Sequence, residues 1–174
     1  LKGSNIQRYG MTSSGNYIRF VPESFQQVAP VEMYRAKEKL LYRFICEVPV
    51  FTYDDQQTLS LNSCNIVIPD VAGLEMKYIL AILNSSVTVY FISKKFNSVK
   101  LLRSHIEQMP IPVVPMDIQT SIIKKVDRIM NSSENISGLY EDLDGDIMQL
   151  FGLSGAHREI IKMFLRKKNL FLRV

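Results

Sequence analysis

The sequence predicts an α+β fold, in which a mixed, largely antiparallel β-sheet packs against helices and a further helical segment follows. Three features favour this class. Residues 38–68 are rich in Val, Ile, Phe, Tyr and Thr, which is typical of half-buried strands. Apolar side chains recur three and four positions apart across residues 74–96, as they do in a helix. Residues 122–150 repeat this spacing in heptads.

Within the β-rich segment, polar breaks at residues 54–57 and 62–63 are short enough for hairpin turns, so we expect three or four strands. Residues 17–20 allow one more strand, and residues 11–16 form a Ser- and Gly-rich loop. The apolar pattern of residues 74–96 predicts one helix, or two helices that meet near Asn84.

A short turn is predicted after this helix, opened by a capping box from Ser104 to Glu107 and ended by Pro110. We place the end of the first domain at residue 113. Residues 114–174 then form a helical spacer and C-terminal helices.

The heptad seam contains a polar residue at Ser133, and Gly138 and Gly145 favour a helix break near either glycine. We therefore expect a packed internal or spacer helix pair rather than a homodimer zipper, with self-association as the lesser alternative. Gly152 is expected to end this segment and Ser154 to cap a last helix. Four apolar residues of that helix are expected to face inward: Ile160, Ile161, Phe164 and Leu165.

Length and composition fit one folded domain with an appendage. The chain has 174 residues, of which 47% are hydrophobic and 22% charged, with a net charge of +4. This composition excludes a disordered, collagen-like or low-complexity chain. The apolar runs are far shorter than the roughly 20 residues that a membrane helix needs, so no membrane partner is expected.

The first residues contain neither an initiator Met nor the apolar core of a secretory signal. We interpret the chain as a fragment of a longer polypeptide and expect a cytoplasmic location. Cys46 and Cys64 are then expected to be buried, reduced thiols rather than a disulfide.

The sequence contains no complete catalytic or metal-binding motif. His105 and His157 are too far apart along the chain for a zinc pattern. The acidic residues 142, 144 and 146 have the spacing that starts a calcium loop, but Ile147 and Leu153 stand where Gly and Glu are required. We read them as a solvated acidic stretch. Neither a phosphate-binding Gly-rich loop nor a nucleophile elbow is present, so we expect no catalytic, cofactor-binding or metal-binding residues in this chain.

Positive charge is concentrated between residues 93 and 105, a stretch without acidic residues. Cations there can meet phosphates, and Asn97 or Arg103 can reach base edges. Residues 1–43 add seven cations against three acids. The candidate DNA-binding residues are Lys94, Lys95, Asn97, Ser98, Lys100, Arg103, Arg8, Arg19 and Arg43.

Two alternatives accompany these candidates. Arg43 is equally well explained as a strand residue with a carboxylate partner. Tyr78, Tyr90 and Phe91 follow helical spacing, so we expect them in the core rather than stacked on bases.

Three stretches, taken in order, resemble the TaqI-like C-terminal specificity domain and the related target-recognition domains of Type I specificity subunits. The first comprises residues 39–45 (Lys-Leu-Leu-Tyr-Arg-Phe-Ile), 51–55 (Phe-Thr-Tyr-Asp-Asp) and 59–62 (Leu-Ser-Leu-Asn). It is similar to the family's strand, its Tyr-Asp turn and the Leu-Asn strand that follows.

The second stretch, residues 78–85 (Tyr-Ile-Leu-Ala-Ile-Leu-Asn-Ser), is similar to the family's Tyr-Leu-Leu-x-Leu-Leu-Asn-Ser helix and is the most specific of the three. It leads to residues 106–112, which resemble the family's Leu-x-x-Ile-Pro-Ile-Pro exit. The third, residues 118–130, resembles the start of the spacer helix, and residues 146–153 are similar to a run near the C-terminus of Type IIG enzymes.

The likeness covers roughly residues 30–165. The chain departs from the family at Asn97 and Ser98, where the family often carries Gly, and residues 1–30 match little. The resemblance implies a double-stranded DNA target-recognition domain of a prokaryotic restriction-modification, or related phage-defence, adenine-N6 methyltransferase.

In this interpretation an upstream methyltransferase or nuclease domain of the same polypeptide is the catalytic partner, and S-adenosylmethionine and Mg²⁺ are expected only there. The alternative is a non-catalytic coiled-coil module that docks proteins and binds no DNA.

Overall fold

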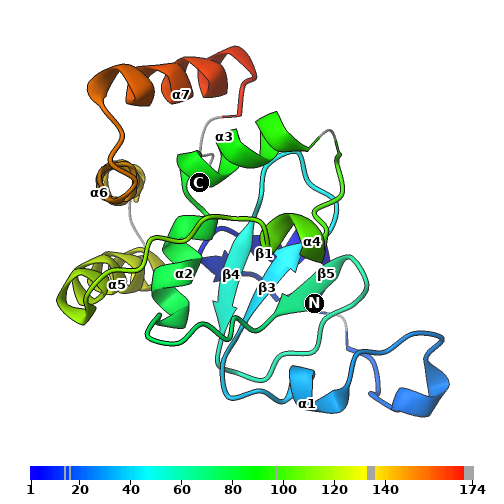
Figure 1. The fold of residues 1–174 in the computed structure, drawn as a ribbon. Helices are drawn as coiled ribbons and strands as arrows, with labels where there is room; N and C mark the ends of the chain where they lie inside the picture. Colours follow the sequence, from blue (N-terminus) through cyan, green and yellow to red (C-terminus); the bar gives the residue numbers. More distant parts are fainter. Residues whose placement is uncertain (14, 16, 97, 133–135, 171–174) are drawn as a thin grey trace.

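The protein has an α+β architecture, which confirms the predicted class (Figure 1). The computed structural model describes residues 1–13, 15, 17–96, 98–132 and 136–170. The central antiparallel sheet has the strand order β4-β3-β5, formed by β3 (Lys39–Arg43), β4 (Phe51–Asp54) and β5 (Cys64–Val67). A small second sheet pairs β1 (Ile6–Gln7) with β2 (Gly10–Met11).

The helices follow the strands along the chain, apart from short early turns. The early elements are the 3-10 turns η1 (Gly3–Asn5) and η2 (Pro22–Ser24) and the helix α1 (Val31–Tyr34). The later helices are α2 (Met76–Leu83), α3 (Ser86–Lys95), α4 (Arg103–Ile106), α5 (Met116–Asn131), α6 (Ser137–Leu150) and α7 (Gly155–Lys167).

The central strand β3 is covered on both faces. Successive side chains of a strand point to opposite faces, so Leu40 and Tyr42 lie in the main core, which includes α2. Leu41 packs on the other side with Ile6 and Cys64. The strand-rich segment therefore contains the strands expected from its composition, and they are antiparallel as predicted.

The predicted strand at residues 17–20 is wrong. These residues lie in irregular structure, and Tyr17 is 89% exposed. A strand needs a neighbouring edge for its backbone hydrogen bonds, and none runs beside this segment among the described residues. The apolar pattern alone does not reveal whether such a partner exists.

The helical segment at residues 74–96 consists of two helices bent by 60° at Asn84, as one of the two predicted alternatives states. Asn84 ends α2, and Ser85 caps α3 by accepting a hydrogen bond from the Thr88 N–H (3.3 Å). No single helix among the described residues is long and apolar enough to cross a membrane. The α2–α3 pair meets that test only jointly, and all side chains of α2 from Tyr78 onward are buried in the core.

Asn84 also attaches α2 to the sheet. The N–H of Arg43 donates to the Val50 carbonyl (3.2 Å), so Tyr42 and Phe51 form a pair that exchanges no hydrogen bonds. The N–H and C=O of Phe51 consequently point away from β3. The Asn84 side-chain amide accepts from that N–H (2.9 Å) and donates to that carbonyl (3.0 Å), as a neighbouring strand would.

The heptad residues form an internal helix pair, as expected. α5 and α6 pack on each other, and their seam side chains belong to the same core as α2. α5 ends at Asn131 and α6 begins at Ser137, just before Gly138, whereas Gly145 lies inside α6. Ser133 lies outside the described residues. Because α2 packs against α5, side chains from both sides of residue 113 share one core, and the boundary drawn there remains a prediction.

The acidic residues of α6 are not merely solvated, contrary to expectation. Lys125 of α5 pairs with Asp142 (2.7 Å) and Asp146 (2.5 Å). Asp144 accepts hydrogen bonds from the backbone N–H (2.8 Å) and hydroxyl (2.5 Å) of Ser86. Burial raises the pKa of Asp144 although these bonds oppose the shift. The three carboxylates therefore join α6 to its neighbours.

The C-terminal predictions hold at both caps. Gly152 has φ +63°, and the N–H of Leu153 donates to the Met148 carbonyl (3.1 Å), which ends α6. Ser154 caps α7 by accepting from the His157 N–H (3.3 Å). Ile161 and Leu165 face α3 as expected. The prediction that Ile160 faces inward is wrong: it is 52% exposed, because it lies about 100° around the helix from Ile161.

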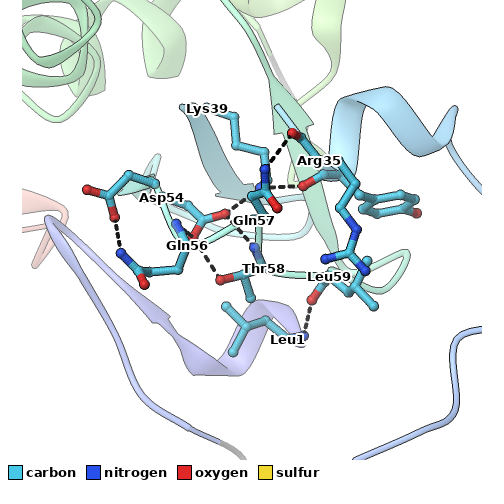
Figure 2. A network of polar contacts seen from close by, with 10 residues as sticks. Leu1, Arg35, Lys39, Asp54, Gln56, Gln57, Thr58 and Leu59 are labelled. Carbon is cyan, nitrogen blue, oxygen red and sulfur yellow. Dashed lines mark hydrogen bonds and ion pairs between the residues drawn. The ribbon is translucent and has the colours of Figure 1, made fainter. Parts of the chain in front are cut away.

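A buried ion pair joins the first residue of β3 to the last residue of β4 (Figure 2). Lys39 and Asp54 face each other across β3 and β4, and both side chains are fully buried. The Lys39 ammonium also donates to the Tyr34 carbonyl (2.9 Å). The Asp54 carboxylate accepts from the N–H of Thr58 (2.9 Å) and of Gln56 (3.1 Å). Burial alone raises the pKa of Asp54, but Lys39 and these donors outweigh it and lower the pKa.

Both cysteines are free, and Cys64 is buried whereas Cys46 is only half-buried. Burial raises the pKa of the Cys46 thiol to about 11 and that of Cys64 to about 12. Both thiols are therefore protonated at neutral pH and are poor nucleophiles.

Asn84→Ala is expected to lower the free energy of unfolding by about 2 kcal/mol, because it leaves the buried N–H of Phe51 without an acceptor. Urea denaturation measures this loss. Asn131→Ala is the matched control, since Asn131 is exposed and, within the part of the chain that the structure describes, its amide donates to the carbonyl of Asp127 on its own helix. Equal stabilities of the two variants would show that Asn84 does not hold the sheet.

Lys39→Met is expected to destabilise by about 3–5 kcal/mol at pH 7, because the Asp54 carboxylate stays buried without its cation. Lys37→Met, at an exposed position, is the control. The folded-state pKa of Asp54 is lowered, so its stabilising contribution is present above about pH 4 and disappears as the pH falls. The gap between wild type and Lys39→Met should therefore narrow towards pH 3, and a constant gap in urea titrations would contradict the assignment.

Candidate nucleic-acid interface

The basic residues predicted between positions 94 and 103 lie at the end of the sheet opposite α1. In Figure 1, α3, the chain after it and α4 occupy this end, near the C-terminal end of β3. We call residues 94–103 the basic segment. It begins in the last turn of α3, where Lys94 and Lys95 complement the negative end of the helix dipole.

An aromatic stack supports the basic segment where it leaves α3. The Phe96 ring lies parallel to the His105 ring, with centroids 4.0 Å apart and planes 18° apart. Phe96 also meets Phe91 edge-on at 6.4 Å. The buried His105 Nδ1 accepts the N–H of Leu102 (3.4 Å), at the start of α4. The predicted capping box is wrong: Ser104 lies inside α4, and His105 satisfies the N-terminal donor instead.

A short two-stranded ribbon holds the middle of the basic segment. Ile45 and Lys100 form an antiparallel bridge. The Cys46 N–H donates to the Val99 carbonyl (2.9 Å), and the Leu101 N–H donates to the Phe44 carbonyl (2.8 Å). We call residues 44–46 and 99–101 the loop ribbon. Leu101 is buried and anchors it.

The cations of the basic segment are exposed. Lys94 and Lys95 lie in the last turn of α3, and Lys100 and Arg103 lie further along the chain. The Lys94 ammonium lies over the Phe164 ring of α7 (4.8 Å), and that of Lys95 lies over the Phe91 ring (5.1 Å). Lys100 lies on the loop ribbon, 5.9 Å from the Phe44 ring. Arg103 is 86% exposed and pairs with Glu107 at 2.6 Å, an exposed contact that contributes little to stability.

An apolar groove of about 560 Å³ lies between α3 and α7. Its lining includes Tyr90, Phe91 and Phe151, with Lys94 and Lys95 among the polar residues. We call it the α3–α7 groove. Tyr78 is a core residue as predicted and donates its hydroxyl hydrogen to the Pro112 carbonyl (2.8 Å). Tyr90 and Phe91 are only half-buried, and they line this groove.

Ser98 is exposed and shapes the loop ribbon. Its hydroxyl accepts the Lys100 N–H (3.0 Å) and donates to the Lys100 carbonyl (3.0 Å). Asn97 lies outside the described residues. Ser98 therefore makes a local turn within the basic segment, with its side chain at the surface.

The structure does not bring the three arginines of the first 43 residues to this surface. Arg8 is buried, and its Nε donates to the Pro49 carbonyl (3.4 Å). Burial lowers the pKa of Arg8, and within the described residues its Nη2 has no hydrogen-bond partner. A buried guanidinium cannot meet a phosphate, so the Arg8 candidate is corrected.

Arg43 extends from β3 and donates through Nε (2.9 Å) and Nη2 to the Ile6 carbonyl, rather than to a carboxylate. It therefore ties β3 to β1. Arg19 is exposed in the segment before α1. That blue segment lies at the opposite end of the sheet from α3 (Figure 1), so Arg19 belongs to a different surface from the basic segment.

Sequence reasoning missed Ile45 and Val99, which are 62% and 61% exposed on the loop ribbon. Both have the β-branched side chains that usually indicate a buried strand position. Their exposure follows from the pairing of two segments more than 50 positions apart, which leaves no signal in the local pattern.

No group of three or more acidic, His or Cys side chains suited to a metal ion occurs among the described residues. The surface chemistry of this end of the protein is therefore that of exposed cations and apolar side chains on a fixed backbone.

One family model, described as the TaqI-like C-terminal specificity domain, matches residues 1–111. The match begins at residue 1, so it includes residues 1–30, for which little similarity was expected. It contains the basic segment and the loop ribbon. A search of curated proteins found no match.

Phe96→Ala is expected to loosen the loop ribbon without unfolding the protein. It removes ring contacts with His105 and Phe91, and aromatic pairs stabilise by about 0.5–1.5 kcal/mol beyond the area they bury. Native-state hydrogen exchange should show the Cys46 and Leu101 amides exchanging up to about tenfold faster.

Phe25→Ala is the control for this variant, because it removes a ring stack on Phe20 in a distant segment. It should leave both amides unchanged. Unaltered exchange in Phe96→Ala would show that the stack does not support the loop ribbon.

Proposed function

This chain belongs to the TaqI-like C-terminal specificity domain family, and on that premise we propose that it recognises a specific sequence in double-stranded DNA for an adenine-N6 methyltransferase. The role of such a domain is DNA target recognition in restriction-modification systems, and it is not catalytic by itself. The catalytic methyltransferase or nuclease domain belongs to the same polypeptide in this proposal. S-adenosylmethionine and Mg²⁺ would bind there, in the cytoplasm of a prokaryote.

The observation that carries the proposal is the exposure of four cations within one short segment. Lys94, Lys95, Lys100 and Arg103 are all exposed, whereas Lys39 and Arg8 elsewhere in the chain are buried. Only Arg103 of the four is given a carboxylate partner by the described residues, and that pair is exposed. Exposed cations can displace the counterions of DNA phosphates, which drives binding to any duplex.

An ordered backbone supports the proposal that this surface distinguishes base sequences as well as binding duplex DNA. Phosphate contacts set the register of a protein on DNA, and side chains in the groove then distinguish the bases. The Phe96–His105 stack fixes the backbone at residue 96, and the loop ribbon fixes it at residues 99–101, before DNA binds. Preorganisation lowers the entropic cost of binding. With the register set, the proposed catalytic domain would meet one adenine and extrude it from the duplex.

The helices after residue 113 would act as the spacer. α5 and α6 pack on α2, so they continue the core that carries the sheet. In this proposal they hold the recognition surface at a set distance from the catalytic domain. Their internal pairing leaves self-association through a zipper as a minor alternative.

The second candidate is a protein-docking module that binds no DNA. The α3–α7 groove favours it, because the groove is apolar and its lining includes Ile160, which is 52% exposed. Such a module would bind duplex DNA weakly at any salt concentration.

The double variant Lys94→Glu with Lys100→Glu tests the proposal. Removal of two phosphate contacts should weaken binding to a random-sequence duplex and reduce the slope of log K against log salt by about 2. Fluorescence anisotropy at salt concentrations between about 50 and 200 mM measures both the affinity and the slope. Over this range, binding driven by many phosphate contacts weakens by about 10³–10⁵-fold.

The double variant Lys37→Glu with Lys124→Glu carries the same change in net charge at exposed positions outside the basic segment. It should reduce the slope by much less. Equal slopes for the two variants would remove the basic segment from the interface. Weak, salt-independent binding by the wild type would favour the docking module.

A further inference from the structure

The loop ribbon fixes the relative positions of Ile45 and Lys100. The hydrogen bonds that flank this bridge join the neighbouring residues, so Ile45 and Lys100 form a pair that exchanges none. In such a pair the two Cα atoms approach to about 4.5 Å and the side chains lie together on one face. The side chains of Ile45 and Lys100 therefore leave the backbone side by side, and the Lys100 ammonium lies 5.9 Å from the Phe44 ring.

This face is apolar as well as basic. Ile45 is 62% exposed. Leu102 lies two residues after Lys100 in extended backbone, so its side chain points the same way, and it is 39% exposed. The intervening Leu101 points inward and is buried. The face therefore presents Ile45 and Leu102 around Lys100, on a backbone anchored from behind.

The major groove of B-DNA has the right size and chemistry for this face. It admits a two-stranded ribbon, and its only apolar group is the 5-methyl of thymine. Cytosine, adenine and guanine present polar edges there, which an aliphatic side chain cannot satisfy. A cation beside the aliphatic group can meet a phosphate or the O6 and N7 acceptors of guanine.

We infer that the loop ribbon enters the major groove and that Ile45 recognises a thymine through its 5-methyl group. The inference rests on the proposed function, since it assumes a duplex as the partner. Charge complementarity selects that occupant over a second copy of the chain or an apolar peptide: exposed cations accompany the ribbon along the basic segment, and a second copy would repel them.

The experiment begins with wild-type protein and a random duplex pool, from which bound sequences are enriched. The enriched sequence is then synthesised with each thymine replaced in turn by uracil, which lacks only the 5-methyl group. At one position the replacement should weaken wild-type binding about fourfold, the effect of one buried methyl group. Ile45→Ala should bind the thymine and uracil duplexes equally at that position.

Ile118→Ala is the matched control, because Ile118 is an exposed isoleucine on α5, outside the basic segment. It should keep the wild-type preference for thymine. The wild-type comparison of thymine with uracil needs no variant, so it tests the inference even if Ile45→Ala folds poorly.

The outcomes separate this inference from the proposed function. Failure to enrich any duplex would overturn the proposed function and the inference with it. Enrichment of a sequence in which no thymine is sensitive to uracil, or in which Ile45→Ala retains that sensitivity, would overturn the inference alone. Loss of self-association in Ile45→Ala, with the preference for thymine unchanged, would assign the face to a second copy.

Discussion

The pairing of the Asn84 side-chain amide with the backbone of Phe51 is the constraint on which the rest of the structure depends. It gives the buried Phe51 N–H its acceptor and donates to the Phe51 carbonyl, which also accepts from the Tyr9 N–H (3.1 Å). The same turn caps α3 at Ser85 and binds Asp144 of α6 through Ser86. Three consecutive residues thus join the sheet to α3 and α6, and they set the direction in which α3 leaves the core.

That direction determines what the surface presents. α3 ends at Lys95, where its chain turns back through the Phe96–His105 stack and pairs with the segment after β3. The loop ribbon is therefore supported at its base by aromatic rings and from behind by Leu101. Under the proposed function, this surface would lose little conformational entropy on binding DNA, because backbone hydrogen bonds already pair the two segments of the loop ribbon.

Burial gives the basic residues opposite roles. Lys39 and Arg8 are enclosed, so their charges serve the fold: Lys39 pairs with Asp54 at the end of β3, and Arg8 packs beneath α6 with its carbonyl accepting the Tyr140 hydroxyl (3.0 Å). Lys94 and Lys100 are exposed, so their charges are at the surface. The net charge of +4 therefore does not show that positive charge is concentrated on the surface at the basic segment.

The sequence by itself determined what depends on neighbouring residues: the antiparallel strands, the end of α6 at Gly152 and the cap at Ser154. These follow from side-chain periodicity, backbone freedom and local hydrogen bonds. The sequence left open whether residues 74–96 form one helix or two. Only the tertiary structure decided the burial of Arg8, the exposure of Ile45 and the loss of a strand at residues 17–20. Each of those depends on a partner distant in the chain, and a local pattern carries no record of whether that partner is present.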